Sequence, residues 1–272
     1  MTSVTARRER RLHRRLTADD AVFALPARPP HEAAVTEADL EPLPQPAQRF
    51  LRFAGVVGQP ADWSFRAHLS GRFRMRPGQR WMPCEAWQYS SRLEVARVFH
   101  LRIDFAGAVS MLGRDSYLDG HGRMHGRLLG LVTVADGSGP AFDTGELVTF
   151  LNDAVLLAPS MLLRLPVSWR AAGDRSFDVS LTDSGHRVTA RVFLDERDAP
   201  CDFSTEDRFC DSPAGLVRAR WTTPVSGWTR AGCRWMPTRG SATWHLPGGA
   251  FTYAEFDFHP GDIVYNVPPA AW

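Results

Sequence analysis

Apolar and polar residues alternate along most of the chain from about residue 63 onward, which is the period of a β-strand with one buried face. The clearest runs lie at residues 63–69, 99–105, 179–181, 188–192 and 251–253. Turn-forming residues separate such runs at Arg76-Pro77-Gly78, Asp119-Gly120, Asp183-Ser184-Gly185, Asp195 to Asp198 and Pro247-Gly248-Gly249. Because turns this short join neighbouring strands as hairpins, the pattern predicts roughly ten antiparallel strands.

One segment departs from this alternation. The sequence DTGE at residues 143–146 resembles a helix capping box, and LVTFLNDAVLLA after it predicts a helix over residues 144–158. Apolar side chains occupy nearly its whole circumference, with Thr149, Asn152 and Asp153 on one polar flank. We therefore expect a mainly β fold, in which a curled antiparallel sheet (half-barrel or barrel) surrounds an apolar cavity closed by one buried helix.

The residues before the sheet comprise a basic stretch, a proline-rich stretch and a short helix. RRERRLHRR occupies residues 7–15, prolines recur from about residue 24 to Pro46, and AQRFLRFAG predicts a helix that ends at Gly55. We interpret residues 1–42 as a solvated arm, with a tether to an acidic surface as the alternative for its basic part. Residues 43–272 are expected to form a single β-rich domain with the ligand cavity.

Composition narrows the partners and the chemistry. The formal net charge is +2, 23% of the residues are charged and the basic residues are spread out, which argues against nucleic acid as a partner. The chain contains no lysine, which excludes Schiff-base chemistry and the standard phosphate-binding loop. The longest apolar run, residues 154–167, is interrupted by Pro159, Arg164 and Pro166, so stable membrane insertion is not expected.

The cysteines and histidines show no pattern of a metal site. The four cysteines are Cys84, Cys201, Cys210 and Cys233, with no CxxC pair and no secretory apolar segment before them. We expect reduced thiols and a cytoplasmic location. His121 and His125 have the spacing of some zinc ligands, but the glycines around them favour a tight turn over residues 120–126. No metal is expected, and the absence of nucleophile-elbow and dinucleotide motifs implies no cofactor.

The run at residues 97–105 has two distinct faces. Phe99, Leu101, Ile103 and Phe105 lie on one face, and His100, Arg102 and Asp104 lie on the other. The polar face is either a solvent-exposed stripe or a wall of the cavity. In the second case, His100 and Asp104 serve as acid or base on a substrate between them, and Arg102 holds an anionic group.

Asp153 is the first catalytic candidate. A carboxylate on an almost wholly apolar helix loses hydration, which raises its pKa and suits it to general acid or base catalysis. The alternatives are an ion pair with one of the many arginines, or a place on the only hydrated edge of the helix. Asn152 on the same flank is a substrate-binding candidate.

The aromatic strand at residues 81–89 offers a second binding wall. Trp81, Glu85, Trp87 and Tyr89 share one face of it. They would suit a conjugated or polycyclic ligand, with Glu85 as a polar point among the rings. Core packing is the alternative use of these aromatic side chains.

A series of sequence phrases from about Leu43 to the C-terminus resembles a large, functionally uncharacterised bacterial family, a domain of unknown function. The phrases are LPQPAQRFLRFAGVVG, WMPCEAWQY, GRDSYLDGHGRMHGRLLG, DTGELVTFLNDAVLLAPSMLL, Trp169 and WHLPGGAFTYAEF. The resemblance implies a fold similar to the half-barrels of lipoprotein carriers. The family usually has arginine-tyrosine and then glutamate in the helix, where this chain has Thr149, Phe150 and Asp153, and HLRID at residues 100–104 replaces an aromatic phrase. These departures leave room for a specialised role.

Three functions are consistent with these observations. The first is a cofactor-independent cyclase, isomerase or lyase that acts on an apolar small metabolite, with protons moved by Asp153, Asp104 and His100. The second is a noncatalytic carrier or sensor of a lipid or hydrophobic metabolite. The third is a structural or interaction protein whose pocket is packed core. Titratable groups on apolar elements favour the enzyme, whereas the fold resemblance favours the carrier; no pattern fixes the oligomeric state.

Overall fold

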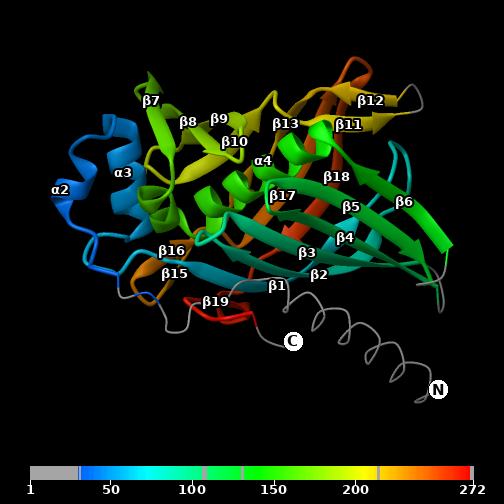
Figure 1. Ribbon diagram of the computed structural model, residues 1–272, viewed down its shortest axis with the longest axis horizontal. Coiled ribbons are helices and arrows are strands. Elements are labelled where there is room, and N and C mark those ends of the chain that lie inside the picture. The colour runs from blue at the N-terminus through cyan, green and yellow to red at the C-terminus, as the bar shows by residue number, and fades with distance from the viewer. Residues whose placement is uncertain (1–29, 31, 106–108, 130–131, 213–214, 270–272) are drawn as a thin grey trace.

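Most of the chain forms one large antiparallel sheet that curls around a central helix, α4 (Pro140–Leu157) (Figure 1). The computed structural model describes residues 30, 32–105, 109–129, 132–212 and 215–269. The first ten strands of the sheet are β1 (Ser64–Phe73), β2 (Met82–Ser91), β3 (Ala96–Asp104), β4 (Ser110–Leu118), β5 (His121–Leu128), β6 (Val132–Ser138), β7 (Val167–Gly173), β8 (Ser176–Asp183), β9 (His186–Leu194) and β10 (Pro200–Thr205). The others are β13 (Arg220–Thr222), β14 (Val225–Ser226), β17 (Arg239–Leu246), β18 (Gly249–Asp257) and β19 (Ile263–Tyr265).

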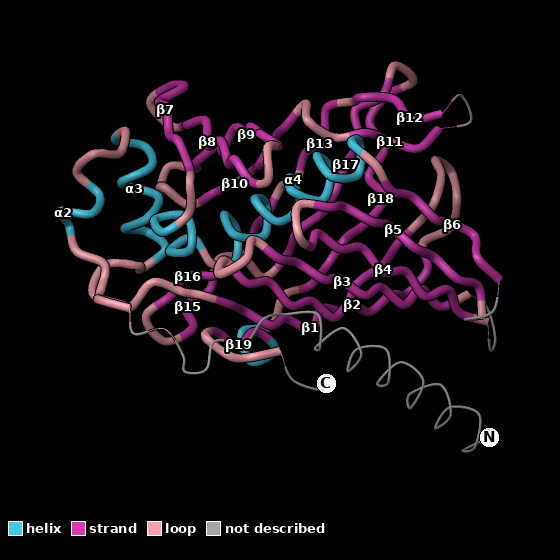
Figure 2. Tube along the Cα trace, viewed as in Figure 1, coloured by secondary structure: helices cyan, strands magenta, loops and turns pink. Residues whose placement is uncertain are grey.

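The sheet is open. Its strand order is β6-β5-β4-β3-β2-β1-β18-β17-β13-β10-β9-β8-β7, with β14 beside β17 and β19 beside β1. The end strands β6 and β7 do not pair with each other, so the sheet is a half-barrel and not a closed barrel. Two small hairpins stand apart from it, β11 (Phe209–Ser212) with β12 (Gly215–Arg218) and β15 (Thr229–Ala231) with β16 (Arg234–Met236). Figure 2 shows how few helices accompany these strands. The mainly β, curled antiparallel fold predicted from the alternation is confirmed.

Helix α4 is buried nearly all round, as its apolar circumference predicts. It begins at Pro140, earlier than the expected start, because Gly139 with φ 99° and Pro140 form its first turn. Asp143 is therefore not the N-cap. Its carboxylate accepts a hydrogen bond from the Gly122 amide of β5 at 2.7 Å, which fixes the first turn of the helix to the sheet. A 3₁₀ turn, η1 (Pro159–Arg164), follows the helix.

The glycines of β5 allow α4 to lie directly on the strand. A Cβ atom on Gly122 would lie 2.0 Å from the Phe142 carbonyl oxygen, so only glycine fits there. The predicted turn over residues 120–126 is therefore wrong. The turn is confined to Asp119 (φ 52°) and Gly120 (φ 78°), and the two histidines belong to strand β5.

Two short helices precede the sheet. Helix α2 (Glu37–Leu40) is capped by Thr36, and α3 (Gln45–Ala54) ends at Gly55 with φ 78°, as its sequence predicts. Val35 and Leu40 are at most 1% exposed and belong to the main core, so the packed structure includes residues before the expected boundary at residue 43. The basic stretch at residues 7–15 lies outside the described residues.

A buried ionic cluster joins four distant segments. Asp62, which is 0% exposed, accepts hydrogen bonds from Arg234 at 2.6 and 2.7 Å. Its carboxylate also accepts from the Ser160 hydroxyl at 2.5 Å and from the Asn266 amide at 3.1 Å. This cluster connects the entry to β1 with η1, β16 and the residue after β19.

Among the helices described, none is both long and apolar enough to span a membrane.

Candidate functional site

A cavity of about 250 Å³ lies between α4 and the sheet. We call the face of the sheet that lines it the inner face, and the opposite face the outer face. Most of its wall is apolar. Representative lining residues are Leu69 and Phe73 of β1, Phe99 and Leu101 of β3, Leu156 of α4 and Phe256 of β18.

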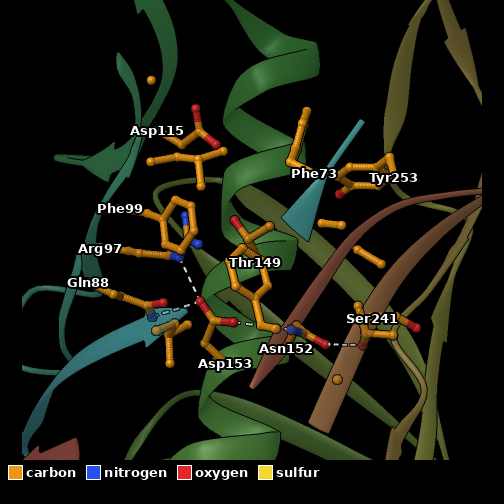
Figure 3. Close-up of a pocket in the computed structure, with 18 of the residues that line it drawn as sticks. Phe73, Gln88, Arg97, Phe99, Asp115, Thr149, Asn152, Asp153, Ser241 and Tyr253 are labelled. Carbon is orange, nitrogen blue, oxygen red and sulfur yellow. Dashed lines mark hydrogen bonds and ion pairs between the residues drawn. The ribbon is translucent and has the colours of Figure 1, made fainter. Parts of the chain in front are cut away.

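Asp153 lies on one wall of the cavity and forms an ion pair and hydrogen bonds with three neighbouring side chains (Figure 3). Its carboxylate forms an ion pair with the Arg97 guanidinium at 2.7 Å and accepts a hydrogen bond from the Gln88 amide at 2.8 Å. The Asn152 amide donates a third bond at 3.1 Å. Asn152 in turn accepts a hydrogen bond from the Thr223 hydroxyl at 2.5 Å. Asp153 and Asn152 thus lie together on the cavity wall, and the carboxylate of Asp153 is engaged in an ion pair.

Glu146 lies about two turns before Asn152 and Asp153 on α4 and links two arginines. It is 2% exposed, and its carboxylate lies 3.2 Å from Arg97 and 3.9 Å from Arg208. The Thr149 hydroxyl donates to it at 3.0 Å. Burial opposes the charge of Arg97, but the carboxylates of Asp153 and Glu146 outweigh that effect and the pKa of Arg97 is raised. Arg97 therefore stays positively charged inside the protein.

Asp115 is a candidate that the sequence did not single out. It lies on the inner face of β4, beside Phe99 of β3 and Met124 of β5. Burial, and then the negative charge of Glu146, raise the pKa of Asp115 to about 7, although Arg97, Arg208 and Arg114 oppose the rise. A carboxyl that exchanges its proton near neutral pH and faces a cavity can serve as an acid or a base.

Arg208, between β10 and β11, completes the polar part of the wall. Its guanidinium carbon lies 4.4 Å from the ring centre of Trp221 and 5.4 Å from that of Trp244. The Trp221 indole donates a hydrogen bond to the Tyr253 hydroxyl oxygen at 3.1 Å. Burial raises the pKa of Tyr253 despite the positive charge of nearby Arg208, so the hydroxyl keeps its proton. The two indoles and the tyrosine hold this arginine at the cavity.

The other residues proposed from sequence lie on the outer face. Arg97, Phe99 and Leu101 of β3 line the cavity, which places the alternate residues His100, Arg102 and Asp104 on the opposite side of the strand. Physically, the apolar face of this strand is the one that packs toward the helix. His100 is nevertheless only 6% exposed, so the outer face is not simply a hydrated stripe.

The aromatic candidates belong to the same outer face. Gln88 of β2 lines the cavity, so Glu85, Trp87 and Tyr89 point the other way. The Trp87 ring stacks on His68 at 5.1 Å, and Arg102 forms an ion pair with Glu85 and lies 3.5 Å from Asp104.

The remaining two aromatic candidates also have partners. Tyr89 donates a hydrogen bond to the Val267 carbonyl at 3.0 Å. Trp81 lies beneath the guanidinium groups of Arg72 and Arg74, at 4.9 and 4.4 Å. All of these aromatic candidates thus have partners in the protein, and none of them lines the cavity.

Histidine and cysteine side chains do not assemble a metal centre in the part of the chain that the structure describes, where no group of three potential ligands is found. The His121 side chain is 81% exposed and lies 3.9 Å from Asp143. All four cysteines are free thiols, and burial raises the pKa of Cys84 to about 12.

Solved structures that are similar to this chain include the following three. One is a LolA superfamily protein from Nitrosomonas europaea, with 14% identity and a TM-score of 0.38, over 80% of this chain and 92% of that one. The second is a DUF1329 family protein from Desulfovibrio piger, with 11% identity and a TM-score of 0.38, over 82% and 92%. The third is a beta-barrel-like protein of the domain of unknown function DUF1849 from Brucella abortus, with 9% identity and a TM-score of 0.29, over 75% and 98%.

The sequence comparisons concern most of the chain. No curated protein is similar in sequence to it. The model of a family of unknown function, DUF6544, matches residues 33–256, which include α2, α3, α4 and nearly the whole sheet. The phrases that suggested an uncharacterised family fall mainly within this range, and the chain belongs to the DUF6544 family.

Proposed function

We propose that the protein is a noncatalytic carrier or sensor that binds one small, mainly apolar molecule in the cavity between α4 and the sheet. The observation that carries this proposal is the state of the polar wall. Asp153, the best catalytic candidate from sequence, is ion-paired with Arg97 at 2.7 Å and hydrogen-bonded to Gln88 and Asn152. A carboxylate engaged by three protein groups positions those groups and is poorly placed to contact a ligand.

The apolar wall supports the same proposal. Transfer of an apolar molecule from water into such a cavity is favourable by roughly 25 cal/mol for each Å² of surface buried, and needs no reactive group. The polar residues at one end then set the orientation of the ligand.

We also propose the reducing cytoplasm as the place of action, which is supported by the free thiols of all four cysteines.

A second candidate function is acid–base catalysis on the same apolar ligand. The observation that favours it is Asp115, whose pKa is raised to about 7 and whose side chain lines the cavity. In this alternative, Asp115 and not Asp153 moves the proton in a cofactor-independent isomerase, cyclase or lyase reaction.

The test identifies molecules that copurify with the protein, and it compares ligand binding with and without a substitution that fills the cavity. Organic extracts of the purified protein are analysed by mass spectrometry, and binding of the neutral fluorophore N-phenyl-1-naphthylamine is titrated. A Cβ atom on Gly113 would lie 3.7 Å from the Leu101 Cβ, on the inner face, so Gly113→Leu fills the cavity. Asp104→Asn on the outer face is the matched control, because its side chain is 43% exposed and outside the lining.

We expect the wild type and Asp104→Asn to bind the fluorophore equally, and Gly113→Leu to bind it at least about tenfold more weakly. Fluorophore binding that Gly113→Leu leaves unchanged, together with extracts free of small molecules, would refute the proposal. If the extracted molecule is chemically altered on incubation with fresh protein, and Asp115→Asn abolishes the change, the enzyme is the correct function.

A further inference from the structure

Arg208 carries a hydrogen-bond donor that the described residues do not use. The residue is 8% exposed and lines the cavity. Its Nε atom is buried and has no hydrogen-bond partner among the described residues. A buried N–H group without an acceptor is costly, so this donor is expected to meet an acceptor other than the described residues.

There is room beside this donor. A Cβ atom placed on Gly145 of α4 would have a single neighbour within 4 Å, namely the Arg208 Nε at 4.0 Å. The absence of a side chain at Gly145 therefore leaves open space next to the Nε. The two indoles on which the guanidinium stacks fix its position at that space.

Tyr253 adds a second donor at the same end of the cavity. Its oxygen accepts from the Trp221 indole at 3.1 Å, and no acceptor for its own proton is found among the described residues. Its side chain lines the cavity near Arg208. Arg208 can only donate, and Tyr253, whose oxygen already accepts from Trp221, has its own proton left to donate. The complementary ligand group is therefore an acceptor oxygen.

The charges around these donors decide which kind of acceptor fits. Arg97 and Arg208 are matched by Glu146 and Asp153, and Asp115 adds a further acidic group on β4. A ligand carboxylate would place another negative charge in this balanced, buried cluster, which is unfavourable without a cation to pair with it. A neutral carbonyl oxygen satisfies the donors without that cost.

We propose that Arg208 and Tyr253 bind the neutral carbonyl oxygen of a mainly apolar ketone or ester whose hydrocarbon part fills the rest of the cavity. This inference rests on the proposed binding function and names the ligand class. It assigns a positioning role to Arg208: the arginine selects the ligand by its oxygen, while the apolar wall supplies most of the affinity.

The test uses three probes of equal chain length, 2-decanone, decane and decanoate, in competition with N-phenyl-1-naphthylamine at pH 8. In the wild type, 2-decanone should displace the fluorophore at concentrations about tenfold or more below those of decane, because a hydrogen bond to a charged donor is gained. Decanoate should compete no better than decane. In Arg208→Met, the advantage of 2-decanone over decane, measured as the ratio of their displacing concentrations, should disappear.

Tyr253→Phe provides a second variant, since it removes one hydroxyl and keeps the ring. It should reduce the advantage of 2-decanone in part, and it carries the test if Arg208→Met fails to fold, as judged by circular dichroism and thermal melting. Arg230→Met, at an exposed position on β15, is the control for loss of an arginine.

The outcomes separate the two proposals. Equal competition by 2-decanone and decane in the wild type, a ketone preference retained in both variants, or the tightest binding by decanoate would each overturn the carbonyl assignment. If the fluorophore does not bind, or decane does not displace it, the proposed binding function itself fails.

Discussion

Asp153 illustrates how the partners of a residue decide its role. On the isolated helix its carboxylate is a lone charge among apolar side chains, which suggested a catalytic role. In the fold, Arg97 from β3 and Gln88 from β2 reach it across the cavity wall. The sequence left three accounts open, namely a general acid or base, an ion pair and a place on the hydrated edge of the helix, and the ion pair is the one that these contacts support.

We predict that Asp153→Asn lowers the free energy of unfolding by about 2–3 kcal/mol, because a buried ion pair is broken while Arg97 keeps Glu146 as a partner. Urea denaturation measures the change. The matched control is Asp198→Asn. The side chain of its ion-pair partner, Arg49, is 35% exposed, so this substitution should lower the free energy of unfolding by less than about 1 kcal/mol. Equal effects of the two substitutions would contradict a special role for the buried pair.

Asp115 should make stability depend on pH. Because its pKa in the folded protein is raised to about 7, the folded state keeps a proton that the unfolded chain releases above about pH 4. The contribution of Asp115 to stability therefore falls as the pH rises from about 4 to about 7 and is level above that. The charged groups facing Asp115 are Glu146, Arg97, Arg208 and Arg114.

We expect Asp115→Asn to gain stability relative to the wild type as the pH rises through this window, by at most about 1.4 kcal/mol per pH unit. Denaturant unfolding of both proteins at pH 5, 6, 7 and 8 gives the difference. Parallel curves across the series would show that Asp115 titrates near its ordinary value.

The sequence predicted only part of this site. Asn152 and Asp153 stand out because they interrupt an apolar helix, and both line the cavity. Asp115 and Arg208 do not interrupt an apolar pattern in this way. Each is one charged residue among many, and its burial depends on strands distant in sequence. On β2 and β3 the period of two identified the two faces, but which face meets the helix depends on how the sheet curls.

Elements were easier to predict than residues, because a period extends over many positions. Alternation predicted the antiparallel sheet, and the change of period located α4. The predicted start of α4 and the predicted turn over residues 120–126 were wrong for different reasons. The helix starts earlier because Gly139 and Pro140 form its first turn. Gly122 is needed for the close contact with Phe142, which involves two elements and leaves no signal in either one alone.

That contact leads to a prediction for the pair of elements. Gly122→Ala would place a methyl group 2.0 Å from the Phe142 carbonyl oxygen, so α4 must move away from β5. We expect a loss of about 1–3 kcal/mol in unfolding free energy and weaker fluorophore binding, since α4 forms one wall of the cavity. Gly248→Ala is the control, because nothing lies within 4 Å of its added Cβ. Unchanged stability of Gly122→Ala would mean that α4 does not lie in close contact with β5 at this position.

Across the whole molecule, the cluster around Asp62 joins η1 and the β15–β16 hairpin to the paired strands β1 and β19. Arg234→Met would leave a fully buried carboxylate without its cation, and should cost about 3–5 kcal/mol. Thermal melting and limited proteolysis check this, with the exposed Arg230→Met as the comparison. A melting temperature equal to that of the comparison variant would show that the cluster contributes little to stability.

The unpaired end strands of the sheet, β6 and β7, have a further consequence. In a closed barrel, strand number and stagger fix the radius, and a larger interior requires a new hydrogen-bond register all the way round. An open sheet has no such constraint, and its curvature can relax while every ladder stays intact. The capacity of the interior is then set by the side chains that α4 and the sheet direct into it, so substitutions at those positions can adapt the same scaffold to molecules of different size.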